Sequence, residues 1–331
     1  QRSKQNQKRF FCGLGCFGIL ISLTVFYGSF IEPRIITVTE HQISLPVEED
    51  LTIAVLSDTH VGPYKGQRFM KRIATKVNAL EPDIILLVGD YVFHGNDPGD
   101  HLDPLADLKA RYGVYGVLGN HEYTCFGGNQ FIAQRVVGFD QSARVLRLLE
   151  RLGVTMLRNS STKVILDSGV LHPSSQKSKR SNGDPATPDS AQKLEQRYMK
   201  NDPKKKAVLH IAGIDDMCSG RDRLEEALPE IQRKAAVILL AHDPSVILDN
   251  NTKYPNLIVS GHTHAGQIRL PFIGALTNLP TQLGRKYDQG LFEIDKNTTL
   301  AITRGVGESG PRARLFAPPE ILVLEVKIGE G

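Results

Sequence analysis

Short aliphatic runs dominate the middle of this chain, and most of them end in Asp, His or Asn. Segments with helical periodicity lie between several of these runs, at 66–80, 104–111, 129–152 and 221–228. Buried apolar runs that are separated by helices are typical of parallel strands in an α/β fold. Three later runs, 290–295, 298–303 and 320–326, have little helical pattern between them and indicate an antiparallel part. The earlier runs lie at 51–58, 83–90, 113–120, 206–213, 236–243 and 256–264.

The composition excludes several classes of protein. The chain has 331 residues, of which 40% are hydrophobic and 23% charged, so it is neither fibrous nor globally disordered. A formal net charge of +4 is too small to indicate nucleic acid, and we expect no nucleic-acid partner. Four cysteines, with no C-x-x-C pair, exclude a disulfide framework and a zinc knuckle.

The N-terminal segment has the composition of a membrane anchor. Residues 10–31 carry no charge, and four basic residues precede them. A bilayer core needs about 20 apolar residues, whereas the apolar part of a cleaved signal has about 7–15. We therefore interpret residues 1–31 as a basic arm with an uncleaved anchor, and residues 32–331 as one domain.

A basic insertion is expected at residues 172–206. The first half of this segment is rich in Ser, Pro and Gly, and the whole carries nine Lys or Arg against four Asp or Glu. Two interpretations remain open, a solvated loop and a patch that contacts an anionic bilayer.

The polar residues that follow the aliphatic runs predict a metal site. One Asp after a strand is usually a turn residue, but five such positions are hard to assign to chance. Ligands gather at the carboxyl ends of strands in α/β folds, and mixed imidazole and carboxylate donors suit Mn, Fe, Zn or Ni. Two ions there would stabilise an in-line displacement at phosphorus. The residues are Asp58, His60, Asp90, Asn120, His121, His242, His262 and His264.

The order of these motifs resembles that of the calcineurin-like metallophosphoesterase superfamily. The motifs are D-x-H, G-D, G-N-H-E, a His after a strand and G-H-x-H. The resemblance implies a four-layer αββα sandwich of two mixed sheets. It also implies two divalent ions, with Mn²⁺ as the first candidate, and His121 as the catalytic residue. Asp58, His60 and His264 would hold the first ion and Asn120, His242 and His262 the second, with Asp90 bridging them. Tyr91 and Glu122 depart from the family pattern, which usually has a short polar residue and an Asp at these positions.

Two further segments, GHTHAGQIRLPFIGAL and TRGVGESGPRARLFAPPEILVLEV, resemble a membrane-linked branch of that superfamily. This branch includes UDP-2,3-diacylglucosamine pyrophosphatases of bacterial lipid A biosynthesis. The resemblance implies attack of water on the α-phosphorus of this lipid-linked nucleotide, giving lipid X and UMP. Arg269, Arg304 and Arg314 are candidates to bind the second phosphate. The alternatives are a membrane-attached phosphatase or phosphodiesterase for another envelope phosphoester, and a non-catalytic scaffold.

The location of the domain relative to the membrane is the least determined feature. We expect the bacterial inner membrane. Basic residues before the anchor favour an N-terminus in the cytoplasm, so a spanning helix would place the domain outside. A UDP-lipid is made inside, and Cys125 and Cys218, expected to be unpaired, favour a reducing compartment. We therefore expect the cytoplasmic face. Two interpretations remain open: the apolar segment lies in one leaflet without crossing, or the substrate is extracytoplasmic.

Overall fold

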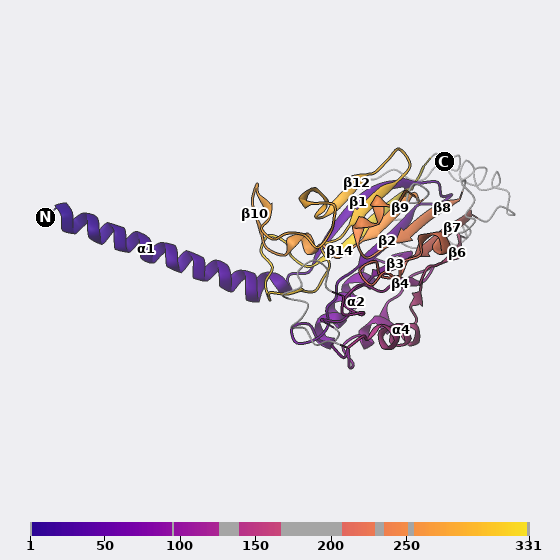
Figure 1. Cartoon of the computed structure of the whole chain (residues 1–331), viewed down its shortest axis with the longest axis horizontal. Coiled ribbons are helices and arrows are strands. Elements are labelled where there is room, and N and C mark those ends of the chain that lie inside the picture. The colour runs from indigo at the N-terminus through magenta and orange to yellow at the C-terminus, as the bar shows by residue number, and fades with distance from the viewer. Residues whose placement is uncertain are drawn as a thin grey trace, which may run out of the picture.

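The computed structural model describes residues 2–94, 96–125, 139–166, 207–228, 235–250 and 255–329, and the insertion expected at 172–206 lies outside them. Two six-stranded mixed sheets form the centre of the domain (Figure 1). The first has the order β1–β14–β2–β3–β4–β5, and the second has the order β12–β13–β9–β8–β7–β6. The first sheet comprises β1 (Thr37–Leu45), β2 (Leu51–Leu56), β3 (Ile84–Val88), β4 (Val114–Val117), β5 (Thr155–Met156) and β14 (Glu320–Ile328). The second comprises β6 (Ser160–Leu166), β7 (Ala207–Gly213), β8 (Ala236–Leu240), β9 (Leu257–Ser260), β12 (Gly290–Glu293) and β13 (Thr299–Ile302).

The strands that precede the polar motifs are parallel within each sheet. In the first sheet β2 pairs with β3, and β3 with β4, so their carboxyl ends share one edge. In the second sheet β8 and β9 are parallel neighbours. These five strands are the aliphatic runs predicted from the sequence, and all are almost fully buried.

The hydrophobic core has three parts that define four layers. The largest part lies between the sheets, where side chains of β2 and β3 meet those of β7, β8 and β9. A second part covers the outer face of the first sheet with α2 (Gln67–Asn78) and α4 (Ser142–Arg151). A third covers the second sheet and includes α6 (Leu224–Ala227) and the 3₁₀ helix η5 (Pro244–Leu248). The expected αββα sandwich is therefore confirmed.

Several predicted elements need correction. The segment 104–111, expected to be a helix, contains only the short 3₁₀ helix η3 (Asp103–Asp107). The last three strands form no separate antiparallel sheet. β12 pairs antiparallel with β13, but β13 continues the second sheet in parallel to β9. β14 joins the first sheet between β1 and β2. Long-range strand pairing decides this arrangement, and local periodicity does not report it.

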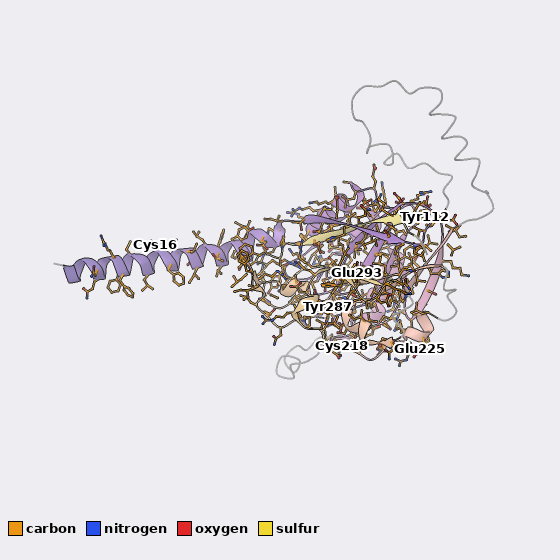
Figure 2. The ribbon with its side chains drawn as sticks, turned by 90° about the horizontal axis from the view of Figure 1, so that it is seen from above. Cys16, Tyr112, Cys218, Glu225, Tyr287 and Glu293 are labelled. Atoms are coloured by element: carbon orange, nitrogen blue, oxygen red, sulfur yellow. A yellow bond between two sulfur atoms is a disulfide. The ribbon has the colours of Figure 1, made fainter. Side chains whose placement is uncertain are left out.

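The N-terminal helix α1 (Arg2–Phe26) extends away from the domain and continues into the π-helical turn η1 (Tyr27–Ile31) (Figures 1 and 2). Among the described residues, one helix is long and apolar enough to cross a membrane, between residues 9 and 34, and none of its apolar window is buried. Ser22 and Thr24 donate their hydroxyl protons to carbonyls one turn earlier, so these polar groups are satisfied within the helix. The helix could therefore associate with a membrane.

Candidate metal centre

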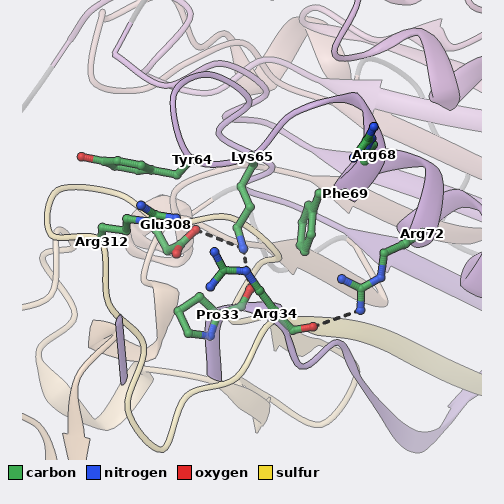
Figure 3. A pocket seen from close by; sticks show the side chains of 9 residues that line it. All are labelled: Pro33, Arg34, Tyr64, Lys65, Arg68, Phe69, Arg72, Glu308 and Arg312. Atoms are coloured by element: carbon green, nitrogen blue, oxygen red, sulfur yellow. Dashed lines mark hydrogen bonds and ion pairs between the residues drawn. The ribbon is translucent and has the colours of Figure 1, made fainter. Parts of the chain in front are cut away.

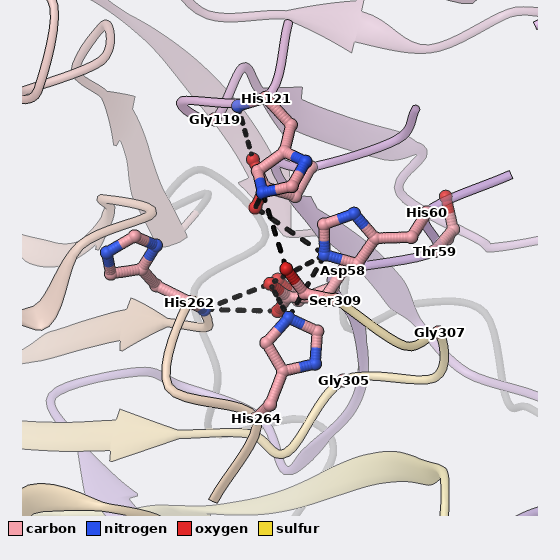
Figure 4. Close-up of polar contacts among 12 residues, drawn as sticks. Asp58, Thr59, His60, Gly119, His121, His262, His264, Gly305, Gly307 and Ser309 are labelled. Carbon is pink, nitrogen blue, oxygen red and sulfur yellow. Dashed lines mark hydrogen bonds and ion pairs between the residues drawn. The ribbon is translucent and has the colours of Figure 1, made fainter. Parts of the chain in front are cut away.

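Histidine and carboxylate side chains from both sheets converge at the carboxyl ends of the strands (Figure 4). The first sheet contributes the residues after β2, β3 and β4, and the second contributes those after β8 and β9. All eight predicted residues take part, and all are buried except His262, which is partly exposed. The structure thus brings together side chains that lie up to about two hundred positions apart in the sequence. The roles of these residues as metal ligands stay a prediction.

The first group of donor atoms consists of Asp58, His60 and His264. The Nε2 atoms of His60 and His264 are 3.0 Å apart, and His264 Nε2 lies 3.2 Å from Asp58 Oδ1. Burial lowers the pKa of His264 to about 4, so its imidazole is neutral and can offer a lone pair. Two imidazoles and one carboxylate form a donor set that suits a divalent transition metal.

The second group consists of Asp90, His242 and His262. Asp90 Oδ2 lies 3.1 Å from His242 Nε2, and His242 Nε2 lies 3.2 Å from His262 Nδ1. The same Asp90 oxygen is 3.6 Å from His60 Nε2 in the first group. Asp90 therefore stands between the two groups, as a bridging carboxylate would.

Asn120 provides a test of whether these residues fit a metal. Its side-chain amide donates to the carbonyl of Cys125 at 2.6 Å, which turns the other end of the amide toward the cavity. Asn120 Oδ1 is buried and has no hydrogen-bond partner among the residues that the structure describes. A buried carbonyl oxygen without a partner is costly, and a cation at the second group would satisfy it. The donor set therefore fits two divalent ions.

The backbone at the motifs is held in an unusual conformation. Five of the eight residues have φ between 43° and 68°, in the left-handed region, which costs a non-Gly residue about 1 kcal/mol or more. They are Asp58, His60, Asp90, His262 and His264. Gly261 permits the closest approach, since a Cβ there would collide with Ser57 Oγ and Asp58 Oδ2. Such strain persists only where the surrounding structure enforces it, as at a functional site.

His121 faces the same cavity but is held differently from the other histidines. The backbone N–H of His94 donates to His121 Nδ1 at 3.1 Å, and His121 Nε2 lies 3.9 Å from Asp90 Oδ2. Burial lowers the pKa of His121 well below its usual value, so the ring is neutral. Its single proton is then on Nε2, which also lies 3.5 Å from Ser309 Oγ. This geometry provides a hydrogen-bond donor beside the two donor groups.

Comparison with known proteins agrees with this arrangement. The model of the calcineurin-like phosphoesterase family matches residues 51–266, which is more than half of the chain. The chain belongs to this family. An uncharacterized metallophosphoesterase of Bacillus subtilis is 28% identical over 309 residues, which cover 91% of this chain and 89% of that relative. A transmembrane protein with a metallophosphoesterase domain from Danio rerio is 27% identical over 86% of this chain, which spans only 56% of that relative. A phosphopantetheinyl hydrolase from Mycobacterium tuberculosis has a TM-score of 0.36 and 14% identity over 80% of this chain and 91% of that structure.

The two residues that depart from the phosphoesterase pattern have structural roles. Glu122 does not orient His121; its buried carboxylate accepts backbone N–H groups of Tyr91, Val92 and Gly119 at 2.7–3.1 Å. Burial raises the pKa of Glu122 to about 8, and these donors act in the opposite direction. It therefore joins the turns that carry Asp90 and His121.

Tyr91 points away from the metal centre and does not line the cavity described below. Its hydroxyl lies 3.1 Å from the carbonyl of Leu87 and 3.0 Å from that of Val117. Gly116 makes room for it, since a Cβ there would lie 2.8 Å from the Tyr91 hydroxyl.

The three arginines predicted to bind substrate phosphate have partners within the protein, and Arg314 Nη2 also lies 3.4 Å from His264 Nδ1. Arg314 is fully buried, and its guanidinium donates to backbone carbonyls that include those of Gly307 and Ala317. Arg304 pairs with Glu320 at 3.0 Å, and Arg269 pairs with Asp288. None of the three lines the cavity described below. Sequence spacing does not show which charges the fold neutralises internally, and the role of these arginines in binding phosphate stays a prediction.

The expectation that Cys125 and Cys218 are unpaired is wrong. They form a disulfide with a Cα–Cα distance of 5.9 Å across a sequence separation of 93 residues. The bond joins the loop that carries Asn120 to the segment after β7, so it reinforces the wall of the phosphoesterase site. The wide separation of the two cysteines concealed their pairing in the sequence.

A cavity of about 830 Å³ opens over the metal centre. Asp90, Asn120, His121, His262 and His264 form its polar floor. Its other walls carry both apolar and amide side chains, including Met217, Ile268, Asn278, Leu279, Pro280 and Gln282. This volume lies in the range of ligand sites, about 300–1,000 Å³, and exceeds what a lone phosphate needs.

Proposed function

We propose that this phosphoesterase hydrolyses the pyrophosphate of a lipid-linked nucleotide at a membrane, with UDP-2,3-diacylglucosamine as the first candidate. Water attacks the α-phosphorus, and UMP and lipid X are released. The observation that carries the hydrolytic part is the position of Asp90 between two donor groups. Nearby, the buried Asn120 Oδ1 has no hydrogen-bond partner in the described part of the chain. The large, partly apolar cavity and the apolar α1 support an amphipathic substrate.

Two bound divalent ions would supply Lewis-acid stabilisation of the phosphoryl oxygens. They would also lower the pKa of a bound water toward neutrality. The protein's own groups have separate tasks. Asp58 and Asp90 keep negative charge in a buried site, which selects for cations. His121 donates a hydrogen bond from Nε2 to the departing oxygen, because Nδ1 already accepts from His94. The amides of Asn278 and Gln282 are available to the distant part of the substrate.

A second candidate is a phosphoester of the cell envelope, hydrolysed outside the cytoplasm. The Cys125–Cys218 disulfide favours it, because disulfides persist in oxidising compartments. The basic arm at the start of α1 favours a catalytic domain outside the cytoplasm too, because positive residues stay in the cytoplasm. The two candidates share the metal centre and differ in the substrate and in the face of the membrane.

The test is hydrolysis by the full chain with Mn²⁺ in ¹⁸O-labelled water. With UDP-2,3-diacylglucosamine we expect the label in the phosphate of UMP; label in lipid X would place the attack at the other phosphorus. His121→Ala serves as the inactive control. Removal of residues 1–31 should weaken hydrolysis of micellar lipid far more than that of a soluble phosphodiester. Turnover of a chromogenic phosphodiester without turnover of the UDP-lipid would favour the envelope phosphoester, and no turnover with any metal would favour a scaffold.

A further inference from the structure

A second, smaller pocket of about 190 Å³ lies at the foot of α1 (Figure 3). It is formed by the 3₁₀ helix η2 (Glu32–Arg34), the segment from 64 to 72 that includes the start of α2, and residues 308 and 312. Five of its nine lining residues are Lys or Arg, and one is acidic. The metal centre uses none of these residues, so the pocket needs an explanation of its own.

The pocket has an excess of positive charge that the protein does not neutralise. Lys65 is buried, pairs with Glu308 at 3.2 Å and donates to the carbonyl of Pro33. The four remaining basic side chains are exposed arginines, and within the described ranges none of them pairs with a carboxylate. Like charges gathered around one hollow repel each other and are stabilised by an anion. They are Arg34, Arg68, Arg72 and Arg312.

Hydrogen bonds fix this pocket to the end of the membrane helix. The backbone N–H of Arg314 donates to the carbonyl of Gly28 at 2.8 Å, and that of Ala317 donates to the buried Glu32 carboxylate at 2.7 Å. Arg72 donates to the carbonyl of Arg34 at 3.1 Å. The pocket therefore keeps a constant position along the axis of α1.

That position matches the headgroup layer of a bilayer. The uncharged run 10–31 rises about 1.5 Å per residue, or roughly 33 Å in all, close to the hydrocarbon core of about 30 Å. Arg34, the first basic residue after this run, is then at the depth of lipid phosphates. The pocket opens where such phosphates are most concentrated.

The hairpin that begins with β10 lies at the same end of the domain as α1 (Figure 1), and it carries exposed apolar side chains. Phe272 is fully exposed and Ile273 is 62% exposed, in the turn between β10 (Arg269–Leu270) and β11 (Gly274–Ala275). This hairpin is joined to the foot of α1 through Leu315, which bridges to Ile268 and lies beside Gly28. Exposed aromatic and aliphatic side chains next to basic ones are typical of a surface that contacts lipid.

We propose that the basic pocket binds the phosphate of an anionic phospholipid headgroup in the membrane that α1 enters. The bound lipid holds the domain against the bilayer. Residues 308–312 form a shared wall, because Glu308 and Arg312 line the pocket while Ser309, Gly310 and Pro311 line the metal cavity. The lipid site therefore lies one loop away from the catalytic cavity and keeps it near membrane-borne substrates.

The test measures binding of phosphatidylglycerol to the full chain in a neutral detergent, by native mass spectrometry. The variant is Arg68→Gln/Arg72→Gln, whose side chains are exposed on α2, so the fold should persist. The matched control is Arg147→Gln/Arg151→Gln, which removes the same charge from a basic cluster on α4. Hydrolysis of a soluble phosphodiester verifies that both variants are folded.

We expect the affinity for phosphatidylglycerol to fall by about tenfold or more in the α2 variant, with little change in the α4 variant. Phosphatidylcholine, which has no net charge, should bind more weakly to the wild type. Equal losses in both variants, or no loss in the α2 variant, would overturn the proposal. Displacement of the lipid by inorganic phosphate alone would identify a site for free anions and would overturn it too.

Discussion

The backbone N–H of His94 donates to His121 Nδ1 at 3.1 Å. An N–H donor requires an unprotonated acceptor, so this contact fixes the tautomer in which Nε2 carries the proton. This backbone amide orients the ring, and it fixes the opposite tautomer to the one that a carboxylate accepting from Nδ1 would favour. The fold of the loop thus presents the Nε2 proton to the cavity.

His121→Ala should therefore remove most of the activity and leave the metal content unchanged. Removing a proton donor of this kind lowers the rate by about 10²–10⁴. The measurement is kcat on a soluble phosphodiester, together with metal content by elemental analysis. If the variant loses an ion, His121 is a ligand and its assignment here is incorrect.

Asp90→Ala should empty both metal positions. Its Oδ2 atom lies 3.6 Å from His60 Nε2 and 3.1 Å from His242 Nε2, so a single carboxylate serves both donor groups. Without it, each position loses an anionic ligand. Metal content should fall from two ions per chain toward none, and a variant that retains two ions would contradict the bridge.

The disulfide should be visible as a thiol count and as a contribution to stability. Denatured, unreduced protein should show two reactive thiols, those of Cys12 and Cys16, and four after reduction. Cys125→Ser should lower the free energy of unfolding by about 2–5 kcal/mol, because the bond closes a loop of 93 residues. It should also weaken binding of the second ion, because Asn120 bonds to the carbonyl of residue 125. Cys12→Ser is the control, and four thiols before reduction would contradict the pairing.

Lys65 should make stability depend on pH. Burial lowers the pKa of Lys65 from 10.5 to about 8, so the unfolded chain holds this proton more tightly than the folded chain. The free energy of unfolding should therefore rise between pH 8 and pH 10.5, by up to about 3 kcal/mol. Urea unfolding of the full chain in detergent, at several pH values, measures this rise.

Comparison of two variants isolates this contribution. Lys65→Met should lose the rise, whereas Lys71→Met, on the exposed side of α2, should keep it. Identical pH profiles for wild type and Lys65→Met would show that Lys65 keeps its ordinary pKa.

Predictions from the sequence succeeded where one local signal sufficed. The aliphatic runs at 51–58, 83–90 and 236–243 are buried strands because an uninterrupted apolar run is stable only when both faces are covered. Asp58, Asp90 and His242 follow those runs, so their convergence could be predicted from strand ends alone. The uncharged run 10–31 likewise predicted an apolar helix.

The sequence could not indicate contacts that depend on partners distant in the chain. Arg314 looked free to bind phosphate, but backbone carbonyls surround it and enclose it completely. Glu122 stands where the family pattern has an Asp, and only the structure shows that it accepts backbone N–H groups from the turn after β3.

The sequence by itself determined which residue types follow each buried strand and how long the apolar N-terminal run is, because both follow from local hydrophobicity. Only the tertiary structure decided which charges remain unneutralised. Arg304 and Arg314 are satisfied within the domain, whereas Arg68 and Arg72 gather with Arg34 at the foot of α1. The physical reason is that a charge is neutralised or buried by contacts between distant segments. The residue pattern of one segment cannot predict those contacts.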